Sequence, residues 1–224
     1  MQKISNILSN ISSVVFDLDG TLYPFWQSIS GALPLILRHR KIFRAFGRAR
    51  QQLREEPYNA HLTERQVQIV ASVLNVEIEE AATLISRIIY DEWPKTFHNL
   101  NLFQGVRELI LSLRRNRFKL GLLSDSPFVI PKLISLNLSD VWDEILTADM
   151  VGSLKPNSKP FLDISHKIGI KPNDILYVGN SYKYDIVGAN NVGMKTAHYS
   201  RRQVPFGVAD FTFYSYRRFL KYLA

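Results

Sequence analysis

Two carboxylates, Asp17 and Asp19, stand one residue apart directly after an apolar run at 14–16, and Gly20 and Thr21 follow them. Such a run is typical of a buried parallel strand, and a glycine allows the chain to turn sharply and approach a ligand. We expect both carboxylates at the carboxyl end of a central strand, where open α/β sheets bind ligands. They repel each other unless a cation joins them. Mg²⁺ takes such oxygen ligands beside a phosphate, and an aspartate there can attack phosphorus.

Taken alone, an Asp-Gly pair is also typical of an ordinary turn, so polar residues further along the chain decide between the two interpretations. They stand where later predicted strands end or helices begin: Ser124, Lys155, Asn180 and Asp185. If the strand before Asp17 is central, these positions converge on it. A hydroxyl can then donate to a phosphoryl oxygen, a lysine can neutralise the phosphate, and a second acidic loop can complete a metal site. This set predicts phosphoryl transfer, in which positioning and charge neutralisation supply most of the catalysis.

The elements that must position these residues alternate in type. After the first strand, apolar runs predict strands at 118–123, 144–148, 175–178, 195–198 and 209–213. Helical spacing predicts helices at 106–113, from Ser126-Pro127, over 159–168 with Gly169 as its end, around Asp185, and around Leu220. Strands separated by helices predict an α/β fold with a Rossmann-like, mainly parallel sheet and right-handed connections.

Residues 25–100 lack the strand pattern and predict an all-helical cap domain, inserted into a core made of residues 1–24 and 101–224. The spacing of Thr63 and Gln66 suggests a capping box that opens a helix, and Pro94 predicts a helix end near Trp93. The inward-facing positions predicted for three helices are Leu35, Ile42, Phe46, Ala49 and Leu53, then Val67, Val70 and Leu74, then Ile78, Ala82, Ile85 and Ile89.

The composition is that of a globular chain. It has 224 residues, 46% hydrophobic and 21% charged, which suits one core domain with an insertion. No stretch has the apolar length of a membrane span, and residues 1–12 lack the apolar core and cleavage site of a signal peptide. The absence of cysteine excludes disulfides and thiolate metal sites. We therefore expect a cytoplasmic protein without a membrane partner, and the sequence leaves its oligomeric state open.

Four motifs in order make the chain resemble the phosphatase branch of the haloacid dehalogenase-like (HAD) superfamily. The matching segments are Asp17-Leu18-Asp19-Gly20-Thr21, Leu122-Leu123-Ser124-Asp125, Lys155-Pro156, and Gly179-Asn180 with Asp185. The resemblance covers essentially the whole chain, with residues 25–100 as the cap. It implies a Mg²⁺-dependent phosphomonoester hydrolase that acts on a small phosphorylated metabolite through an aspartyl-phosphate.

The resemblance also implies a role for each matching residue. Asp17 is expected to be the nucleophile and a metal ligand. Asp19 is expected to act as acid toward the leaving alcohol and then as base toward water, with its backbone carbonyl on the metal. Lys155 is the third expected catalytic residue. The expected substrate-binding residues are Thr21, Ser124 and Asp125, and the expected Mg²⁺ ligands are Asp17, Asp19, Asn180 and Asp185.

Some positions discriminate among activities of this family. Asp19 favours a phosphatase over a dehalogenase, because expelling an alcohol requires a proton donor and halide departure does not. Thr21, where sugar-phosphate mutases often carry valine, disfavours a mutase. Asn180 replaces the usual aspartate, so we expect weaker Mg²⁺ binding without loss of activity. Gln104 replaces a more familiar proline before Gly105, which we interpret as structural.

Residues 38–54 contain seven Lys or Arg and no acid. Such a run is typical of a solvated helix surface, and it lacks the interleaved aromatics on which nucleic-acid bases stack, so nucleic acid is not the expected partner. An intermediate interpretation is that one or two of these arginines attract an anionic substrate to the cap. The alternatives to a phosphatase are a catalytically weak or inactive HAD-like scaffold that binds a partner through this basic cap, or mutase or dehalogenase chemistry.

The aromatic segment at 23–26 is consistent with a flap over the site or with a hydrophobic anchor between domains. The five histidines are scattered without metal-ligand spacing. Of these, His98 and His198 are the two for which an approach to the site from flanking loops is considered, although we expect packing or surface roles. Lys183 is predicted to lie on a helix surface.

Overall fold

The computed structural model describes residues 9–56, 61–202 and 207–221. Its core is a six-stranded sheet of β1 (Ser13–Phe16), β2 (Lys119–Ser124), β3 (Glu144–Thr147), β4 (Ile175–Gly179), β5 (Lys195–Tyr199) and β6 (Phe211–Phe213). All five pairings are parallel, and the order β3-β2-β1-β4-β5-β6 places β1 inside the sheet. The predicted Rossmann-like parallel sheet is confirmed, and each strand overlaps its predicted range. Residues 1–8, which form most of the segment considered for a signal peptide, lie outside the described residues.

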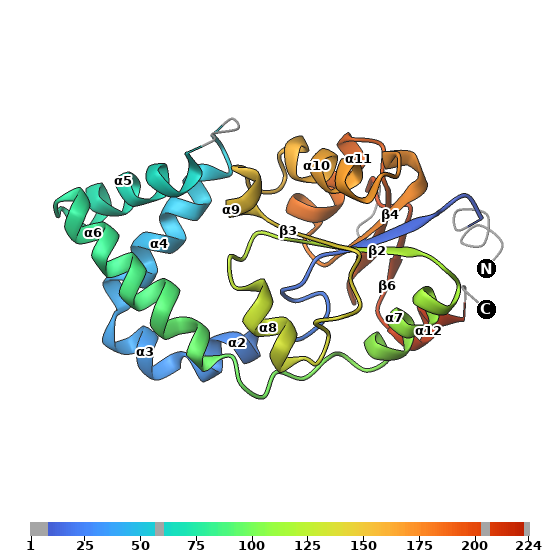
Figure 1. Ribbon diagram of the computed structural model, residues 1–224, viewed down its shortest axis with the longest axis horizontal. Helices are drawn as coiled ribbons and strands as arrows, with labels where there is room; N and C mark the ends of the chain where they lie inside the picture. The colour runs from blue at the N-terminus through green and yellow to red at the C-terminus, as the bar shows by residue number, and fades with distance from the viewer. Residues whose placement is uncertain (1–8, 57–60, 203–206, 222–224) are drawn as a thin grey trace.

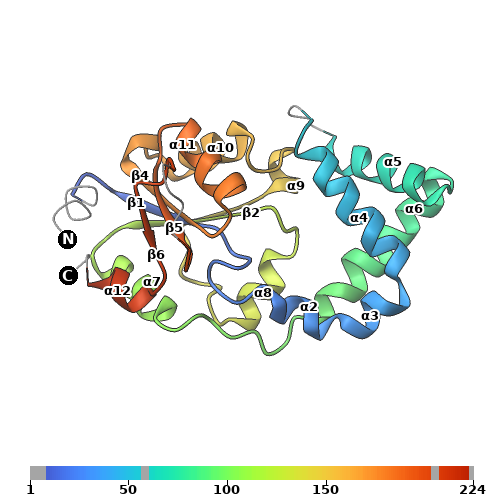
Figure 2. The same cartoon turned by 180° about the vertical axis from the view of Figure 1, so that it is seen from behind.

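Helices cover both faces of the sheet (Figures 1 and 2). The helices α7 (Val106–Arg115) and α12 (Tyr216–Leu220) lie on one face, and α10 (Ser158–Ile168) and α11 (Val187–Asn191) lie on the other. Successive side chains of a strand point to opposite faces. Val14 accordingly packs in one apolar cluster and Val15 in the other. Burial on both faces explains why β1 is apolar throughout.

The register of the sheet decides which polar residues meet. Phe16 is opposite Leu122 of β2 and opposite Val178 of β4. Because the three strands are parallel and level, the residues that follow them emerge at the same edge. Asp17, Ser124 and Asn180 are therefore brought to one edge of the sheet, as the sequence predicted.

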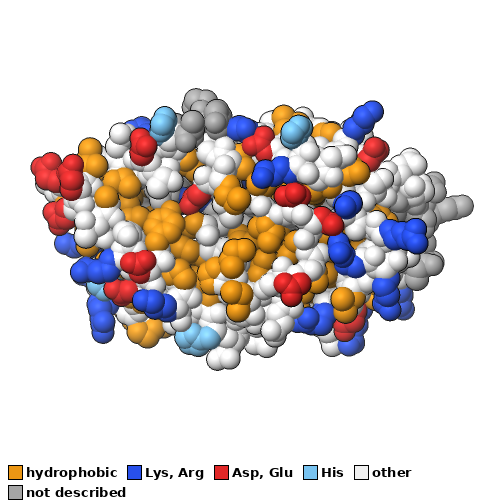
Figure 3. Space-filling view, in the orientation of Figure 1, with side chains coloured by type: hydrophobic (Ala, Val, Ile, Leu, Met, Phe, Trp, Pro, Cys, Tyr) orange, Lys and Arg blue, Asp and Glu red, His pale blue; other side chains and the backbone are white. Residues whose placement is uncertain are grey.

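A helical block joins β1 to β2. Its elements are α2 (Trp26–Gly31), α3 (Leu33–Arg38), α4 (Arg40–Leu53), α5 (Leu62–Leu74), α6 (Ile78–Leu84), the π-helix η1 (Ile85–Glu92) and the 3₁₀-helix η2 (Trp93–Thr96). No strand occurs in the described part of this block, residues 26–56 and 61–96. The block lies beyond the carboxyl ends of the strands (Figure 1). Figure 3 shows the molecule in the orientation of Figure 1, and apolar side chains gather in the middle of this view, where the block meets the core.

Several local predictions for the block are wrong. Its first predicted helix, with its apolar stripe from Leu35 to Leu53, is divided at His39 into α3 and α4. The capping box does not form, because α5 begins at Leu62 after His61 and the Gln66 side chain turns inward to Arg50.

The buried face of the next helix also differs from its prediction. Ile78 and Ala82 are exposed, whereas Ala81 and Ile88 are buried. Ile78 lies in the first turn of α6, and the wider turns of η1 change the angular spacing of the residues that follow. Ile85 and Ile89 are buried as predicted.

The remaining elements of the core are short. They are α8 (Val129–Ser135), α9 (Ala148–Val151), η3 (Pro172–Asp174) and the π-helical turn η4 (Tyr182–Ile186). The helix predicted over 159–168 is confirmed as α10, and it ends at Gly169 in the left-handed conformation. Within the described ranges, no helix combines the length and the apolar character that crossing a membrane requires.

Candidate active site

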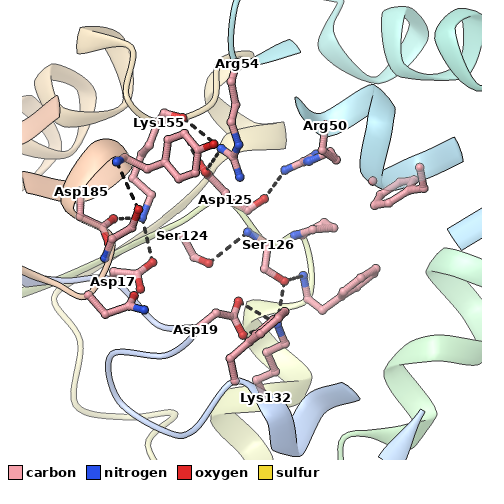
Figure 4. A pocket seen from close by; sticks show the side chains of 18 of the residues that line it. Asp17, Asp19, Arg50, Arg54, Ser124, Asp125, Ser126, Lys132, Lys155 and Asp185 are labelled. Atoms are coloured by element: carbon pink, nitrogen blue, oxygen red, sulfur yellow. Dashed lines mark hydrogen bonds and ion pairs between the residues drawn. The ribbon is translucent and has the colours of Figure 1, made fainter. Parts of the chain in front are cut away.

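Asp17 follows β1 directly and belongs to a buried network of ion pairs (Figure 4). Its Oδ1 accepts a hydrogen bond from Lys155 Nζ at 2.8 Å, and the same Nζ donates to Asp185 Oδ1 at 2.6 Å. Lys155 Nζ also lies 3.1 Å from the Tyr177 hydroxyl. These side chains are nearly excluded from solvent, with Asp17 at 6%, Lys155 at 2% and Asp185 at 1% exposure. Three of the residues that the sequence selected from separate motifs are thus in direct contact.

The charges in this network do not balance. Burial raises the pKa of Asp17 to about 7; the Lys155 ammonium opposes that change and the Asp185 carboxylate adds to it. Burial disfavours the charge on Lys155, but Asp17 and Asp185 outweigh it and raise the lysine pKa well above its usual range. The network therefore holds a permanent ammonium ion beside a carboxyl group that gains from additional positive charge.

Asp19 turns away from this network toward another wall of the site. Both of its carboxylate oxygens accept from Lys132 Nζ, at 2.8 and 2.9 Å, and the Tyr23 hydroxyl donates to its Oδ1. The Lys132 side chain is 4% exposed and its Nζ lies 5.1 Å from the centre of the Phe97 ring. Burial and the Asp19 charge raise the pKa of Tyr23, so its phenol remains a hydrogen-bond donor.

Lys132 and Tyr23 are site residues that the motif reasoning did not select. Lys132 is the one charged residue in the apolar helix α8, whose sequence is VIPKLIS. Lys132 itself is buried, although Ile130 and Ile134 of the same helix are exposed, and a buried lysine requires a partner. A single lysine among apolar residues was the signal available in the sequence. The identity of that partner depends on the tertiary structure.

The loop after β2 places Ser124 at the cavity. Ser124 is 1% exposed, and its Oγ accepts from the backbone N–H of Ser126 at 3.1 Å, a bond that does not use the hydroxyl proton. The Ser126 Oγ accepts from the backbone N–H of Phe128 at 3.2 Å and from Lys132 Nζ at 2.9 Å. The predicted helix start at Ser126-Pro127 is therefore wrong. Ser126 forms a turn of the loop, and α8 begins at Val129.

Asp125, expected to bind substrate, is engaged with protein donors. Its Oδ1 accepts from the Lys155 backbone N–H at 3.0 Å, and its Oδ2 forms an ion pair with Arg54. Its backbone carbonyl accepts from Arg50. The geometry therefore favours a positioning role for Asp125 between the Lys155 loop and the helical block.

Thr21, also expected to bind substrate, lies under Asp17 and not on the wall of the cavity. It is fully buried, and its Oγ1 donates to Asp17 Oδ2 at 2.7 Å and lies 3.1 Å from Asn180 Oδ1. Gly20 has a φ of +83°, and a Cβ there would lie 2.6 Å from the Asn180 amide nitrogen. The first motif thus packs closely against Asn180 of the fourth motif, because the Thr21 hydroxyl contacts Asn180 and Gly20 has no side chain that would collide with it.

Two arginines of the basic run reach the site from α4. Arg50 Nη1 pairs with Asp149 Oδ1 at 2.6 Å and donates to Gln66 Oε1 at 3.1 Å. Arg54 Nη1 donates to the Lys155 carbonyl at 3.0 Å, and its guanidinium lies 4.4 Å from the centre of the Tyr184 ring. The block therefore contacts the core through charged side chains that lie beside the second, third and fourth motifs.

The aromatic segment at 23–26, two histidines and Lys183 were also considered from the sequence, and the structure shows which of them are buried and which are exposed. Tyr23 is buried, whereas Phe25 and Trp26 are 50% and 65% exposed. The aromatic segment at 23–26 therefore anchors through Tyr23 and exposes Phe25 and Trp26, the second of which begins α2. His198 Nε2 lies 3.2 Å from the Asn180 carbonyl, and burial lowers the pKa of His198. His98 and Lys183 are exposed, and neither lines the cavity.

A cavity of about 320 Å³ lies between the block and the carboxyl ends of the strands. Charged and hydroxyl side chains line one part of it: Asp17, Asp19, Ser124, Ser126, Lys132, Lys155 and Asp185. Apolar side chains line another part: Phe25, Phe46, Trp93, Pro127 and Phe128. The arrangement provides a buried carboxylate, a hydroxyl and an ammonium group at one end, and an apolar space beyond them.

The predicted metal ligands are close to one another, but they do not surround a common point. In the described segments, no group of three or more His, Cys, Asp or Glu side chains could enclose a metal ion. Lys155 Nζ lies between the carboxylates of Asp17 and Asp185, and the Asp19 carboxylate faces Lys132. The chemistry of the donors nevertheless fits Mg²⁺, because they are hard oxygen atoms. Burial raises the Asp17 pKa, and a bound cation would favour the ionised form of this carboxyl group.

Known proteins share this sequence pattern and fold. The model of the haloacid dehalogenase-like hydrolase family matches residues 14–199. A glyceraldehyde 3-phosphate phosphatase of Methanopyrus kandleri is 30% identical over 85% of this chain and 84% of its own. A phosphoglycolate phosphatase of Yersinia pestis is 29% identical over 82% of this chain and 78% of its own.

Solved structures agree in fold at lower identity. A 2-haloacid dehalogenase from Pseudomonas syringae pv. Tomato superimposes with a TM-score of 0.71 at 21% identity, covering 95% of this chain and 98% of its own. An HAD phosphatase from Thermococcus onnurineus gives a TM-score of 0.66 at 23% identity, covering 96% and 98%. These two similarities establish the fold, and they do not distinguish between the two activities.

Proposed function

The chain belongs to the haloacid dehalogenase-like hydrolase family and is a phosphatase of that family, and we propose that it hydrolyses the monophosphate ester of a small metabolite through an aspartyl-phosphate at Asp17, with Mg²⁺ as cofactor. The observation that carries the proposal is the Asp17 carboxylate, held by Lys155 and Thr21 at the end of the central strand. Its relatives named as glyceraldehyde 3-phosphate and phosphoglycolate phosphatases support a small phosphorylated substrate. We also propose that the helical block, residues 25–100, is the cap that selects this substrate.

In the first half of the reaction, an Asp17 oxygen forms a bond to phosphorus while the bond from phosphorus to the alcohol oxygen breaks. The Ser124 hydroxyl donates to a phosphoryl oxygen. The Lys155 ammonium balances charge on the carboxylate and the phosphoryl group. Asp19 delivers a proton to the departing alcohol.

In the second half, water attacks phosphorus, Asp19 accepts its proton, and inorganic phosphate leaves with Asp17 restored. Lys132 and Tyr23 hold the Asp19 carboxylate beside the cavity for both steps.

Asp17, Asn180 and Asp185, with the backbone carbonyl of Asp19, would hold Mg²⁺. When bound, the ion supplies positive charge that stabilises the phosphoryl group and the ionised form of Asp17. Asn180 contributes an amide oxygen where a carboxylate would contribute a charge. We therefore expect weaker metal binding than at a site with a carboxylate at this position.

The decisive experiment measures phosphate release from acetyl phosphate and from a panel of phosphometabolites, with and without Mg²⁺. We expect Mg²⁺-dependent turnover that falls by about a thousandfold or more in Asp17→Asn. In Asp19→Asn, phosphoenzyme formed from acetyl phosphate should accumulate, because this leaving group requires no acid whereas water still requires a base. Absence of phosphate release from every compound, or full activity of Asp17→Asn, would refute the proposal.

A further inference from the structure

We infer that the alcohol portion of the substrate is uncharged and largely apolar, with an aromatic or similarly flat group at the cap side of the cavity. This inference deepens the proposed function and rests on it. It concerns the region beyond the reacting phosphate, where the helical block faces the core.

The first observation is the apolar wall of the cavity. Phe46 comes from α4, Trp93 from η2 and Phe128 from the loop before α8, so three separate segments supply aromatic rings to one space. The Trp93 and Phe128 rings meet edge to face, with centres 5.2 Å apart and planes inclined by 63°. Phe46 and Phe128 are 6% and 4% exposed, so neighbouring residues hold them in place. Such rigid rings favour a flat apolar group over a hydroxylated chain.

The second observation is that every cation lining the cavity, among the described residues, already has a carboxylate partner. On the cap side, Arg50 pairs with Asp149 and Arg54 pairs with Asp125, and both arginines also donate to backbone carbonyls of the core. Lys132 and Lys155 pair with the catalytic aspartates. A carboxylate or second phosphate on the substrate would compete with these aspartates for cations whose charge is already balanced, so it would gain less than beside an unpaired cation.

The third observation is the size of the cavity. Its volume of about 320 Å³ lies at the lower end of the range of about 300–1,000 Å³ found for ligand pockets. The phosphoryl group occupies the part next to Asp17 and Ser124. The remaining space suits a single small ring or a short alkyl chain.

The test compares three esters with similar alkoxide leaving groups: propyl phosphate, 3-phosphooxypropanoate and benzyl phosphate. Propyl phosphate and 3-phosphooxypropanoate differ by one carboxylate. We expect kcat/KM to be at least about tenfold lower for the carboxylate, because it would lie beside apolar side chains and cations that already have carboxylate partners. We expect kcat/KM to be about tenfold higher for benzyl than for propyl phosphate, because the ring contacts the aromatic wall.

Two variants complete the test. Phe46→Leu keeps an apolar side chain but removes one ring, so the preference for benzyl over propyl phosphate should fall several-fold. Arg48→Leu, at an exposed position of the same helix, should leave that preference unchanged. Equal or better turnover of the carboxylate ester than of propyl phosphate would overturn the inference, as would a benzyl preference that is absent or unaffected by Phe46→Leu.

Acetyl phosphate separates failure of this inference from failure of the proposed function. Its leaving group is small and activated, so its hydrolysis does not depend on the apolar wall. If acetyl phosphate is hydrolysed and the carboxylate ester is preferred, only the inference fails. If acetyl phosphate and all three esters are inert, the proposed phosphatase chemistry fails as well.

Discussion

We expect the ionised Asp17 side chain to lower the free energy of unfolding at neutral and alkaline pH. Its pKa is about 7 in the folded protein, against an ordinary value of 3.8. A carboxyl group with a raised folded-state pKa contributes stability at pH values below its unfolded pKa, and that contribution is lost as the pH rises from about 4 to about 7. Since each pKa unit corresponds to about 1.4 kcal/mol, ionised Asp17 lowers the free energy of unfolding by up to roughly 4 kcal/mol above pH 7.

Asp17→Asn removes this charge and keeps an oxygen that can accept from the Thr21 hydroxyl. The variant loses the ion pair with Lys155, but Lys155 retains its contact of 2.6 Å with Asp185. We expect a net gain of about 1–3 kcal/mol in the free energy of unfolding at about pH 8 without metal. The gain should shrink steadily toward about pH 4, where the wild-type carboxyl group is protonated in both states.

Urea unfolding at several pH values in the presence of EDTA measures this difference, with tryptophan fluorescence as the signal. Asp140→Asn, at an exposed position, serves as the matched control and should change stability by less than about 0.5 kcal/mol at any pH. Mg²⁺ should stabilise the wild type more than Asp17→Asn. The reasoning is refuted if Asp17→Asn is no more stable than wild type at about pH 8, or if its advantage does not depend on pH.

Three further substitutions test the site. Lys132→Met should lower the rate of phosphoenzyme formation from an alkyl phosphate about 10–100-fold with less effect on its formation from acetyl phosphate, because only the alkyl leaving group needs the acid that Lys132 positions; equal losses in this step for both substrates would contradict that role. Asn180→Asp should lower the Mg²⁺ concentration for half-maximal activity about tenfold and reduce stability in EDTA by about 1 kcal/mol, since it adds a carboxylate near Asp17; an unchanged Mg²⁺ dependence would argue against Asn180 as a ligand. Gly20→Ala should cost about 1–3 kcal/mol in urea unfolding because of its φ of +83° and its contact with Asn180, whereas Gly47→Ala, where a Cβ would meet open space in α4, should add up to about 1 kcal/mol; similar effects of both changes would be inconsistent with the geometry of the first loop.

Local sequence was sufficient to predict the sheet and the positions of the four motifs. A strand covered on both faces must be apolar throughout, so β1 and β4 were visible as apolar runs bounded by polar residues. Because the carboxyl ends of parallel strands share one edge, the order of elements also predicted the proximity of Asp17, Ser124 and Lys155. These predictions required no knowledge of individual contacts.

Details of the helical block were less predictable. An apolar spacing fixes which side of a helix is buried only while the helix remains regular. The break at His39 interrupted the first predicted helix. The π-helix η1 changed the spacing in the third predicted helix, in which Ile78 and Ala82 are exposed and not buried as predicted. The capping box at Thr63 failed because tertiary contacts of Gln66 with Arg50 competed with the local hydrogen bond.

The sequence by itself determined the class of fold and the chemical groups that the site contains, because both depend on periodicity and on residue types within short segments. Tertiary structure alone decided how these groups are paired. Lys132 reaches Asp19 across 113 positions of sequence, and Arg54 reaches the Lys155 carbonyl across 101. No local spacing specifies such contacts, since they arise only when the sheet register and the packing of the block bring distant segments together. The same packing raises the Asp17 pKa, because burial and neighbouring charges are properties of the folded chain.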